Sequence, residues 1–273
     1  MSVRLAVLGL PIAHSLSPTL HHAAYGVLGL DWQYEAVELA GADLPGFVES
    51  RDESWRGLSL TMPLKRDILP LLDSTSEVAL ETHSANTVLF DHGAVRGFNT
   101  DVYGITEGLA RHGRRSLGTV LVLGAGATAA SALVATRRLG ARKIFVGVRT
   151  PSRAVELVEL GRAQGVSVLV RSLDELVQID EPLDAVVSTL PNGAAVDVRL
   201  DPDVLAHAAL FDVAYSPWPT PLAASWSGEV IGGLEMLVLQ AIAQVRIFVG
   251  GDPDEELDGE DEVLAAMLTS VGL

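Results

Sequence analysis

The chain of 273 residues contains no cysteine. This absence excludes disulfide bonds and thiolate chemistry, and a cytoplasmic location is the expectation. Basic residues are also scarce, because 19 Lys and Arg stand against 35 Asp and Glu, which gives a net charge of −16. Nucleic-acid binding calls for a basic face, so we expect no nucleic-acid partner.

The sequence also lacks a long hydrophobic run. The longest apolar stretch, Met236–Val249, is interrupted by Gln240, Gln244 and Arg246, and we expect it to be too short to cross a bilayer. The apolar segment Leu5–Leu10 has no basic region and no cleavage site beside it, so no signal peptide is predicted. We therefore expect no membrane partner.

Apolar residues still make up 48% of the chain, enough for one large domain or two modest ones with buried cores. Two composition styles meet near residue 100, and each alternates β-like runs with helical stretches, as α/β sheets with covered faces do. Strands are predicted at Val3–Leu8, Tyr34–Val37, Gly57–Thr61, Asn86–Phe90, Val95–Phe98, Val120–Leu123, Ser167–Val170, Ala185–Ser188 and Leu210–Asp212. Helices are predicted at Pro18–Leu28, Asp43–Val48, Lys65–Leu72, Glu77–Thr82, Asp101–Arg111, Leu234–Val249 and Val263–Leu268. The acidic run 252–262 is expected to be a solvated loop.

A glycine turn follows the strand Val120–Leu123 and precedes a helical stretch. Gly124, Gly126 and Ala129 have the G-x-G-x-x-A spacing. In a dinucleotide site the first glycine allows the tight turn, the second lets a pyrophosphate approach the backbone, and the alanine lets the helix pack closely. The helix N-terminus then offers free N–H groups to the phosphates. We therefore predict a Rossmann nucleotide-binding domain.

The next strand ends at Val148, followed by Arg149, Thr150 and, shortly after, Arg153. An NAD site usually has a carboxylate at this position, whereas a 2′-phosphate requires arginine. The pattern favours NADP as cofactor. The plainer interpretation is that Arg149 ends a strand and Arg153 faces water.

Two segments of the first hundred residues carry polar groups at helix starts. Ser17 before Pro18 predicts a helix N-cap, where Ser15 and Ser17 are placed to hold a small anion such as a carboxylate; a plain capping motif is the simpler interpretation. Lys65 enters a helix at its first turn, where a cation opposes the helix dipole. This placement hints at function, although surface lysines often break the preference.

Further polar groups stand at strand edges. Asn86-Thr87 and Asn99-Thr100-Asp101 repeat an Asn-Thr pair, and Asp101 starts a helix, where it is also a good cap. On the late helix, Met236, Gln240 and Gln244 form one stripe, which is usually the wet side but equally suits a cleft. The histidines are not spaced as metal ligands, so no metal site is expected.

The remaining features lie in loops of the second half. Ser188–Gly193 stands at the end of a Rossmann strand, where loops touch the cofactor. The stiff segment 211–222 is expected to project the hydroxyl of Tyr215. Gly232-Gly233 precedes the late helix as a plausible hinge. The candidate cofactor-binding residues are Gly124, Ala125, Gly126, Ala127, Arg149, Thr150, Arg153, Thr189, Gly233 and Met236.

Together these segments resemble the shikimate dehydrogenase family, particularly its actinobacterial type, over nearly the whole length. The segments that carry the resemblance, in the family's order, are 15–18, 60–65, 84–87, 99–101, 124–126, 212–217 and 233–240. The resemblance implies NADP-dependent, reversible reduction of 3-dehydroshikimate to shikimate in the route to aromatic amino acids. It also implies two domains with a cleft between them: residues 1–101 plus 237–273 bind substrate and carry the catalytic groups, and residues 102–236 bind NADP. A monomer or homodimer is expected.

The family's residue roles transfer onto matching positions. Ser15 and Ser17 would hold the substrate carboxylate, and Lys65 with Asp101 would be the acid–base pair. The ring hydroxyls would be bound by Thr61, Asn86, Asp101 and Gln240, with Tyr215 assisting. This chain departs from the family at Ala127, Val148 and Met62, where Gly, Asn and Val are common.

Two alternatives remain open. A sister dehydrogenase would accept quinate or an aminoshikimate, with NAD as an alternative cofactor, and the space around Ser15 and Ser17 would decide between the substrates. A non-catalytic NADP-binding sensor would keep the fold but lose the chemistry of Lys65 or Asp101, and both residues are present.

Overall fold

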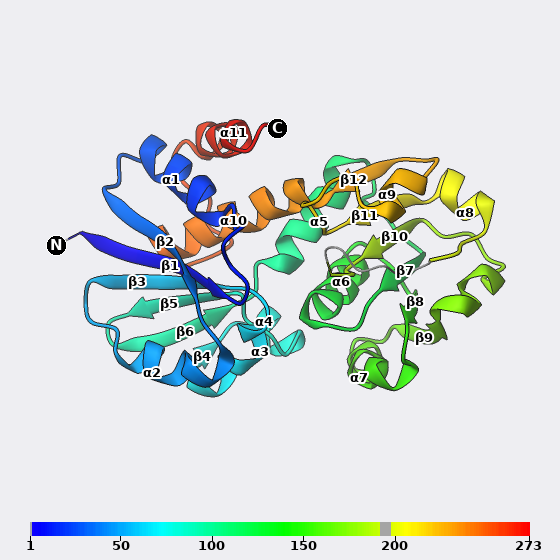
Figure 1. The fold of residues 1–273 in the computed structure, drawn as a ribbon, viewed down its shortest axis with the longest axis horizontal. Helices are drawn as coiled ribbons and strands as arrows, with labels where there is room; N and C mark the ends of the chain where they lie inside the picture. The colour runs from blue at the N-terminus through cyan, green and yellow to red at the C-terminus, as the bar shows by residue number, and fades with distance from the viewer. Residues whose placement is uncertain (1, 192–197) are drawn as a thin grey trace. The chain divides into compact units, whose positions relative to one another are not determined.

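The computed structural model describes residues 2–191 and 198–273. Its contacts divide the chain into a first unit, residues 1–104 with 237–273, and a second unit, residues 105–236. Helices α5 (Asp101–Arg111) and α10 (Gly233–Gly250) each begin in one unit and end in the other. Figure 1 shows a sheet with its helices in each unit.

The first unit is built on a six-stranded mixed sheet in the order β2-β1-β3-β5-β6-β4. Three strand pairs are parallel and two are antiparallel, so the predicted mainly parallel sheet is confirmed. The strands are β1 Val3–Gly9, β2 Trp32–Glu38, β3 Trp55–Leu60, β4 Ser74–Thr75, β5 Thr87–Asp91 and β6 Ala94–Phe98. Its helices, beside α5 and α10, are α1 Ser17–Val27, α2 Leu44–Glu49, α3 Leu64–Asp67, α4 Glu77–Glu81 and α11 Glu260–Ser270, with 3-10 turns at Gly41–Asp43 and Leu69–Leu71.

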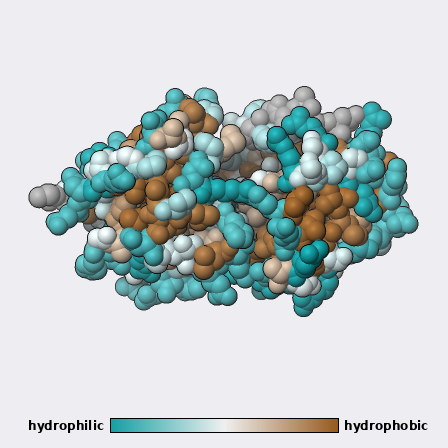
Figure 2. Space-filling model, turned by 90° about the horizontal axis from the view of Figure 1, so that it is seen from below, coloured by the Kyte–Doolittle hydropathy of each residue, from teal (hydrophilic) through white to brown (hydrophobic). Residues whose placement is uncertain are grey.

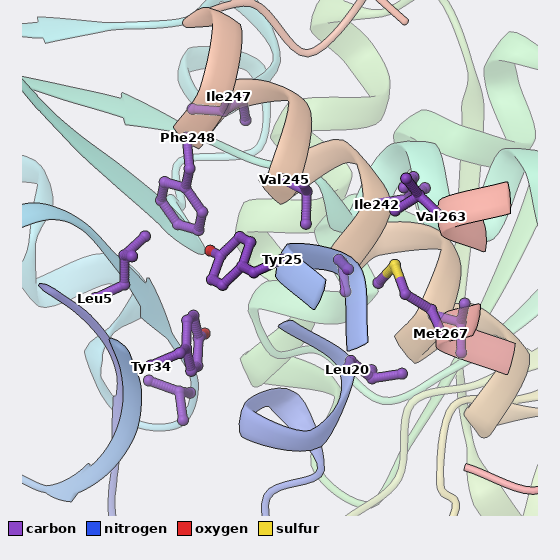
Figure 3. Close-up of a cluster of buried hydrophobic side chains, with 14 of the residues drawn as sticks. Leu5, Leu20, Tyr25, Tyr34, Ile242, Val245, Ile247, Phe248, Val263 and Met267 are labelled. Carbon is purple, nitrogen blue, oxygen red and sulfur yellow. The ribbon is translucent and has the colours of Figure 1, made fainter. Parts of the chain in front are cut away.

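Both faces of this sheet are buried, because side chains alternate along β1. Leu5 and Val7 belong to a core cluster with residues of α1, α10 and α11, and Figure 3 shows the side chains that meet there. Ala6 and Leu8 belong to the opposite cluster, with residues of α2, α3 and α4. A strand buried on both faces reads as a continuous apolar run, as β1 does.

The second unit has six parallel strands in the order β12-β11-β10-β7-β8-β9. This is the Rossmann order, in which the strand sequence reverses between β7 and β10. The strands are β7 Thr119–Leu123, β8 Lys143–Val148, β9 Ser167–Ser172, β10 Ala185–Ser188, β11 Ala209–Asp212 and β12 Val230–Gly232. The helices are α6 Ala127–Arg138, α7 Val155–Ala163, α8 Pro202–His207 and α9 Pro221–Ser225, with 3-10 turns at Pro151–Ala154 and Leu173–Gln178.

Several predicted elements needed correction. The helix expected at Lys65–Leu72 is one α-turn followed by a 3-10 turn, because Pro70 lacks an N–H and restricts the residue before it. The short strands β4 and β12 were missed. Helix α11 begins at Glu260, so the end of the acidic run is helical rather than a loop, and Glu260 pairs with the buried Arg246.

Helix α10, which contains the longest apolar stretch, is by length and composition able to cross a membrane, contrary to the expected shortness. However, 72% of that helix is buried inside the protein, as expected for a core helix. Figure 2 shows polar residues over much of the face in view, with apolar residues in patches between them. Such patches are ordinary for a chain with this apolar content, because folded proteins keep much apolar area on the surface.

Candidate active site

In the first unit, strand pairing brings the polar segments to one edge of the sheet. The carboxyl ends of β1 and β3 are adjacent, since Leu8 pairs with Leu60, and the Thr61 N–H donates to the Leu8 carbonyl over 2.9 Å. Strand β5 runs the other way, so Asn86 stands at the same edge, where its carbonyl accepts from the Leu60 N–H at 2.7 Å. The N–H of Asn86 in turn bonds Phe98, which leads into residues 99–101.

Lys65 and Asp101 form an ion pair at this edge. The Lys65 Nζ lies 2.5 Å from Asp101 Oδ2, and the two side chains are only 14% and 5% exposed. Lys65 is placed by α3, whose neighbouring residues Leu64 and Ile68 are fully buried. A charged pair with so little solvent is held more strongly than a surface pair. The structure thus brings together the two residues expected to act as acid and base.

Asn86 connects this pair to α10. Its Nδ2 donates to Asp101 Oδ1 at 2.8 Å and lies 3.3 Å from Gln240 Oε1. Its Oδ1 accepts from the backbone N–H of Thr100 at 2.9 Å, which fixes the orientation of the amide. Of the expected hydroxyl-binding residues, the structure therefore places Asn86, Asp101 and Gln240 side by side.

Capping at Asp101 differs from the sequence expectation. Asp101 is the first residue of α5, and the backbone N–H of Asp101 donates to Asn99 Oδ1 at 3.0 Å. Asn99 therefore satisfies this N–H at the helix start, and the Asp101 carboxylate remains for Lys65 and Asn86. Asn99 is itself held by its Nδ2, which donates to Thr82 Oγ1 at 2.8 Å.

The predicted N-cap at Ser17 is wrong by one position. Helix α1 begins at Ser17, its N-cap is Leu16, and no side chain caps it. The Ser17 N–H instead lies 3.3 Å from Ser15 Oγ. Ser17 is buried and its side chain hydrogen-bonds Tyr34, whereas Ser15 is half-buried. The start of α1 therefore has backbone N–H groups without a side-chain cap, close to the two serine hydroxyls. This arrangement suits a small anion.

The face of α10 that carries Gln240 and Gln244 is not its solvent-exposed face. Gln240 is 7% exposed and Gln244 is 2% exposed. The Gln240 oxygen accepts from Asn86 and Thr100, and its amide nitrogen donates to the Leu237 carbonyl. The Gln244 amide is likewise fully hydrogen-bonded, so burial costs both side chains little. Periodicity places them on one face but does not reveal that the facing surface is polar.

In the second unit, the glycine turn has the backbone that a dinucleotide site requires. Gly124 has φ +107, a conformation suited to glycine, and its N–H bonds the carbonyl of Gly147. A Cβ added at Gly126 would meet nothing within 4 Å, so this side of the turn is open to a ligand. Helix α6 begins at Ala127 without a side-chain cap, and Ala129 is fully buried against the sheet.

Thr189 lies across this turn, at the point where the strand order reverses. Its Oγ1 donates to the Leu123 carbonyl at 2.7 Å, and a Cβ on Gly124 would reach Thr189 Oγ1 at 2.5 Å. Ligands of open α/β sheets bind at such a reversal point. The expected contacts at Asn192 and Gly193, in the same loop, lie outside the described residues.

Strand β8 ends at Val148, and Arg149 and Arg153 follow it in the chain. Arg149, Thr150 and Arg153 are all exposed, and among the described residues neither guanidinium has an intramolecular hydrogen bond or ion pair. Two unpaired guanidinium groups in a chain of net charge −16 are suited to a phosphate dianion. The residues present therefore fit NADP: the α6 N-terminus and Gly126 for the pyrophosphate, the arginines for the 2′-phosphate.

The other second-unit candidates lie around β11 and β12. The loop that carries Tyr215 is closed by Asp212, whose Oδ2 accepts from Thr220 Oγ1 at 2.6 Å. Burial raises the pKa of Asp212. Gly233 starts α10, and a Cβ there would collide with the Val213 carbonyl, so glycine is required by packing. Met236 follows on the same helix and is buried.

Comparison with known proteins adds to this geometry. A family model described as the shikimate dehydrogenase substrate binding domain matches residues 7–88. The shikimate dehydrogenase (NADP(+)) of Citrifermentans bemidjiense is 35% identical over 284 residues, which cover 97% of this chain and 96% of that protein. The chain belongs to the shikimate dehydrogenase family.

Solved shikimate dehydrogenases have the same architecture. The enzyme of Mycobacterium tuberculosis is similar with a TM-score of 0.86 and 37% identity, over 98% of this chain and 99% of that one. The enzyme of Thermus thermophilus, in complex with NADP(H) and shikimate, gives a TM-score of 0.81 and 32% identity, over 98% and 99%. The resemblance read from the sequence motifs and the predicted α/β fold are thereby confirmed.

In this member of the family, sequence reasoning missed residues that hold the site without belonging to it. Thr87 and Thr100 were noted only as partners of asparagines, yet both bond Asn86 Oδ1. Gln244 was noted only as part of a stripe, yet it contacts the Asn86 backbone. The repeated Asn-Thr pair was the available signal, since a polar pair at a buried sheet edge needs partners.

Proposed function

We propose that this chain is an NADP-dependent shikimate dehydrogenase, which reversibly reduces 3-dehydroshikimate to shikimate in the route to aromatic amino acids. The observation that carries the proposal is the Lys65–Asp101 ion pair beside Asn86 and Gln240, in a chain that belongs to this family. Residues 1–101 with 237–273 serve as the substrate-binding domain and residues 102–236 as the NADP-binding domain.

Each residue then has a chemical task. Bound NADPH supplies the hydride to the carbonyl carbon. The oxygen of that carbonyl gains negative charge, and the Lys65 ammonium stabilises it and donates the proton. The Asp101 carboxylate holds Lys65 in place, at 2.5 Å. In the reverse direction Lys65 accepts the hydroxyl proton.

The substrate groups divide among the remaining residues. Ser15 and Ser17 bind the carboxylate at the open start of α1, and Thr61, Asn86, Asp101 and Gln240 bind ring hydroxyls, with Tyr215 assisting. Gly124, Ala125, Gly126 and Ala127 cradle the pyrophosphate, Thr189, Gly233 and Met236 line the nucleotide site, and Arg149, Thr150 and Arg153 bind the 2′-phosphate. We place the enzyme in the cytoplasm as a monomer or homodimer, without nucleic-acid or membrane partners.

The test is absorbance at the nicotinamide band with purified protein and each pairing of NADP or NAD with shikimate or quinate. We expect turnover to be fastest with NADP and shikimate. Turnover with NAD and quinate alone would instead indicate the sister dehydrogenase, and no turnover with any pairing would indicate a nucleotide-binding sensor.

Lys65→Ala tests the catalytic assignment. It should lower kcat by at least about 100-fold with little change in the KM for NADP, because the lysine acts on the substrate oxygen. Lys143→Ala is the matched control, since Lys143 also pairs with a carboxylate, Glu181 Oε1 at 2.5 Å, but lies in β8. Unchanged kcat in Lys65→Ala, or an equal loss in both variants, would remove Lys65 from the mechanism.

A further inference from the structure

We propose that Gln244 is a positioning residue: it orients Asn86, and through Asn86 the Asp101 carboxylate that holds Lys65. This inference rests on the proposed function, because it assigns the reaction to the Lys65–Asp101 pair. Gln244 lies one helical turn beyond Gln240 on α10 and is 2% exposed. All the hydrogen-bonding positions of its amide are occupied by protein groups, so no contact with substrate is assigned to it.

Gln244 holds Asn86 at two points. The Nε2 of Gln244 donates to the Asn86 backbone carbonyl at 3.2 Å and to Thr87 Oγ1 at 2.9 Å. The Thr87 hydroxyl has one proton, and because it receives a hydrogen bond from Gln244, that proton is directed to Asn86 Oδ1, 2.8 Å away. The amide oxygen of Asn86 is therefore held on the side away from Asp101.

The consequence reaches the ion pair. With its oxygen fixed by Thr87 and by the Thr100 N–H, Asn86 presents its Nδ2 to Asp101 Oδ1 at 2.8 Å. Asp101 then directs its other oxygen to the Lys65 ammonium. Gln244 thus acts on the lysine only through this sequence of contacts.

The other side of Gln244 is fixed as firmly. Its Oε1 lies 2.9 Å from Ser59 Oγ and 3.3 Å from His21 Nε2. Ser59 Oγ accepts a hydrogen bond from the Tyr34 hydroxyl at 2.6 Å, and His21 Nδ1 lies 3.0 Å from the Tyr25 hydroxyl oxygen. In Figure 3 both tyrosines lie among the apolar side chains of the core, where burial shields these bonds from bulk solvent.

The hydrogen bonds of this network all run in one direction, from the two tyrosine hydroxyls through Gln244 to Asn86. The two tyrosine hydroxyls donate toward Ser59 and His21, these donate to Gln244, and Gln244 donates toward Asn86. Burial lowers the pKa of His21 to about 3, so the ring stays neutral, with one nitrogen as donor and the other as acceptor. His21 also stacks on Tyr34, with ring centroids 4.0 Å apart, which fixes its plane.

An amide is the group that this position requires. Two donors arrive at one atom of Gln244 and two acceptors at the other, and a side chain with a carbonyl oxygen and an NH₂ satisfies all four. A carboxylate would place an acceptor against the Asn86 carbonyl, and an apolar side chain would remove one hydrogen bond from each of four buried partners.

The experiment is a double-mutant cycle in the full-length protein with Gln244→Leu, Thr87→Val and the pair. Each single variant should lower kcat by roughly 10-fold with unchanged KM for NADP, through misplacement of the reacting groups. If Thr87 relays the effect of Gln244, the pair should also lose roughly 10-fold rather than the product of both. Multiplicative losses, or a kcat within about twofold of wild type in Gln244→Leu, would overturn the proposal.

Arg246→Met is the matched control for general destabilisation. Arg246 lies on the same helix, is 5% exposed and bonds Glu260, Tyr103 and the Pro253 carbonyl. Arg246→Met should lower the Tm but retain kcat, and an equal loss of kcat there would reduce Gln244 to a structural role. If Gln244→Leu does not fold, Gln244→Met and Thr87→Val carry the same prediction.

A second readout is independent of activity. The side-chain NH₂ resonances of Asn86 should be protected from solvent exchange in wild type and Arg246→Met, and should shift and exchange faster in Gln244→Leu. Unchanged Asn86 resonances in Gln244→Leu would refute the inference, whatever the enzyme does. Absent turnover by wild type, with the NMR effect present, would instead refute the proposed function alone.

Discussion

Replacing His21 by glutamine tests whether the buried imidazole is neutral in the folded chain. Desolvation lowers the pKa of His21 to about 3, with the Gln244 hydrogen bond opposing and His22 assisting the shift. An unfolded chain binds a proton on this histidine below about pH 6.5, whereas the folded chain does not. The folded-state pKa is depressed, so stability falls as the pH drops below about 6.5 and continues to fall toward the folded pKa.

The magnitude follows from proton linkage. A group that titrates only in the unfolded chain costs about 1.4 kcal/mol at pH 5.5, relative to about pH 8, if its unfolded pKa is about 6.5. The glutamine variant, which does not titrate, should lose this dependence. It should be less stable than wild type at about pH 8, because the Tyr25 hydroxyl loses its acceptor. The difference in free energy of unfolding between the two proteins, called the gap below, should narrow by about 1.4 kcal/mol at pH 5.5.

Urea denaturation of both proteins across this pH range measures the gap. The range should stop near pH 5.5 (about one unit above the pI), because the sequence pI is about 4.7 and solubility falls there. His22→Gln, at the exposed next position, is the control for removing a histidine side chain from α1. NMR should show the His21 ring as the Nε2–H tautomer throughout. A constant gap between wild type and His21→Gln, or a His21 ring that titrates near pH 6.5 in the folded protein, would refute the reasoning.

Two further predictions concern the second unit. Arg149→Ala should weaken NADPH by about 10- to 100-fold and NADH far less, because only NADPH carries the extra phosphate; fluorescence titration measures both, and equal weakening would make the arginine structural. His112→Gln should lower the Tm more at about pH 6 than at about pH 9. Desolvation opposes charging of His112, but hydrogen bonds to Glu235 and Glu229 outweigh it and raise its pKa, so its contribution is present below about pH 6.5 and disappears as the pH rises through the raised value. A pH-independent difference in Tm would contradict this.

The helix starts show where local sequence rules stop. Ser17 before Pro18 and Asp101 after Asn99-Thr100 both have the composition of N-caps, and α1 and α5 begin at these residues. However, neither side chain serves as the cap. Asn99 accepts the Asp101 N–H at the start of α5, and the Ser17 side chain hydrogen-bonds Tyr34, a residue of β2. Capping rules count only near neighbours, so a distant partner that competes for the same oxygen escapes them.

The acidic run shows the same limit for charge patterns. Eight carboxylates without a basic residue between Asp252 and Glu262 predict a solvated loop. However, Glu260 is the first residue of α11 and pairs with Arg246. Arg246 is a buried residue of an apolar helix, and the sequence around Arg246 or Glu260 contains no pattern that predicts their ion pair. The desolvation of Arg246 is what makes this partner necessary.

By itself the sequence determined the features that depend on short stretches of chain. Alternating apolar strands and helices specify an α/β fold, and the glycine turn with its following strand specifies a dinucleotide site, because backbone freedom and period are local properties. The tertiary structure decided what lies opposite each polar side chain. Strand β5 runs antiparallel to β3, so Asn86 meets Asp101 and Gln240 at one edge, and Gln244 faces buried hydroxyls instead of water. Hydrogen-bond partners separated by many residues are fixed by strand pairing and packing, and no periodicity in the sequence records them.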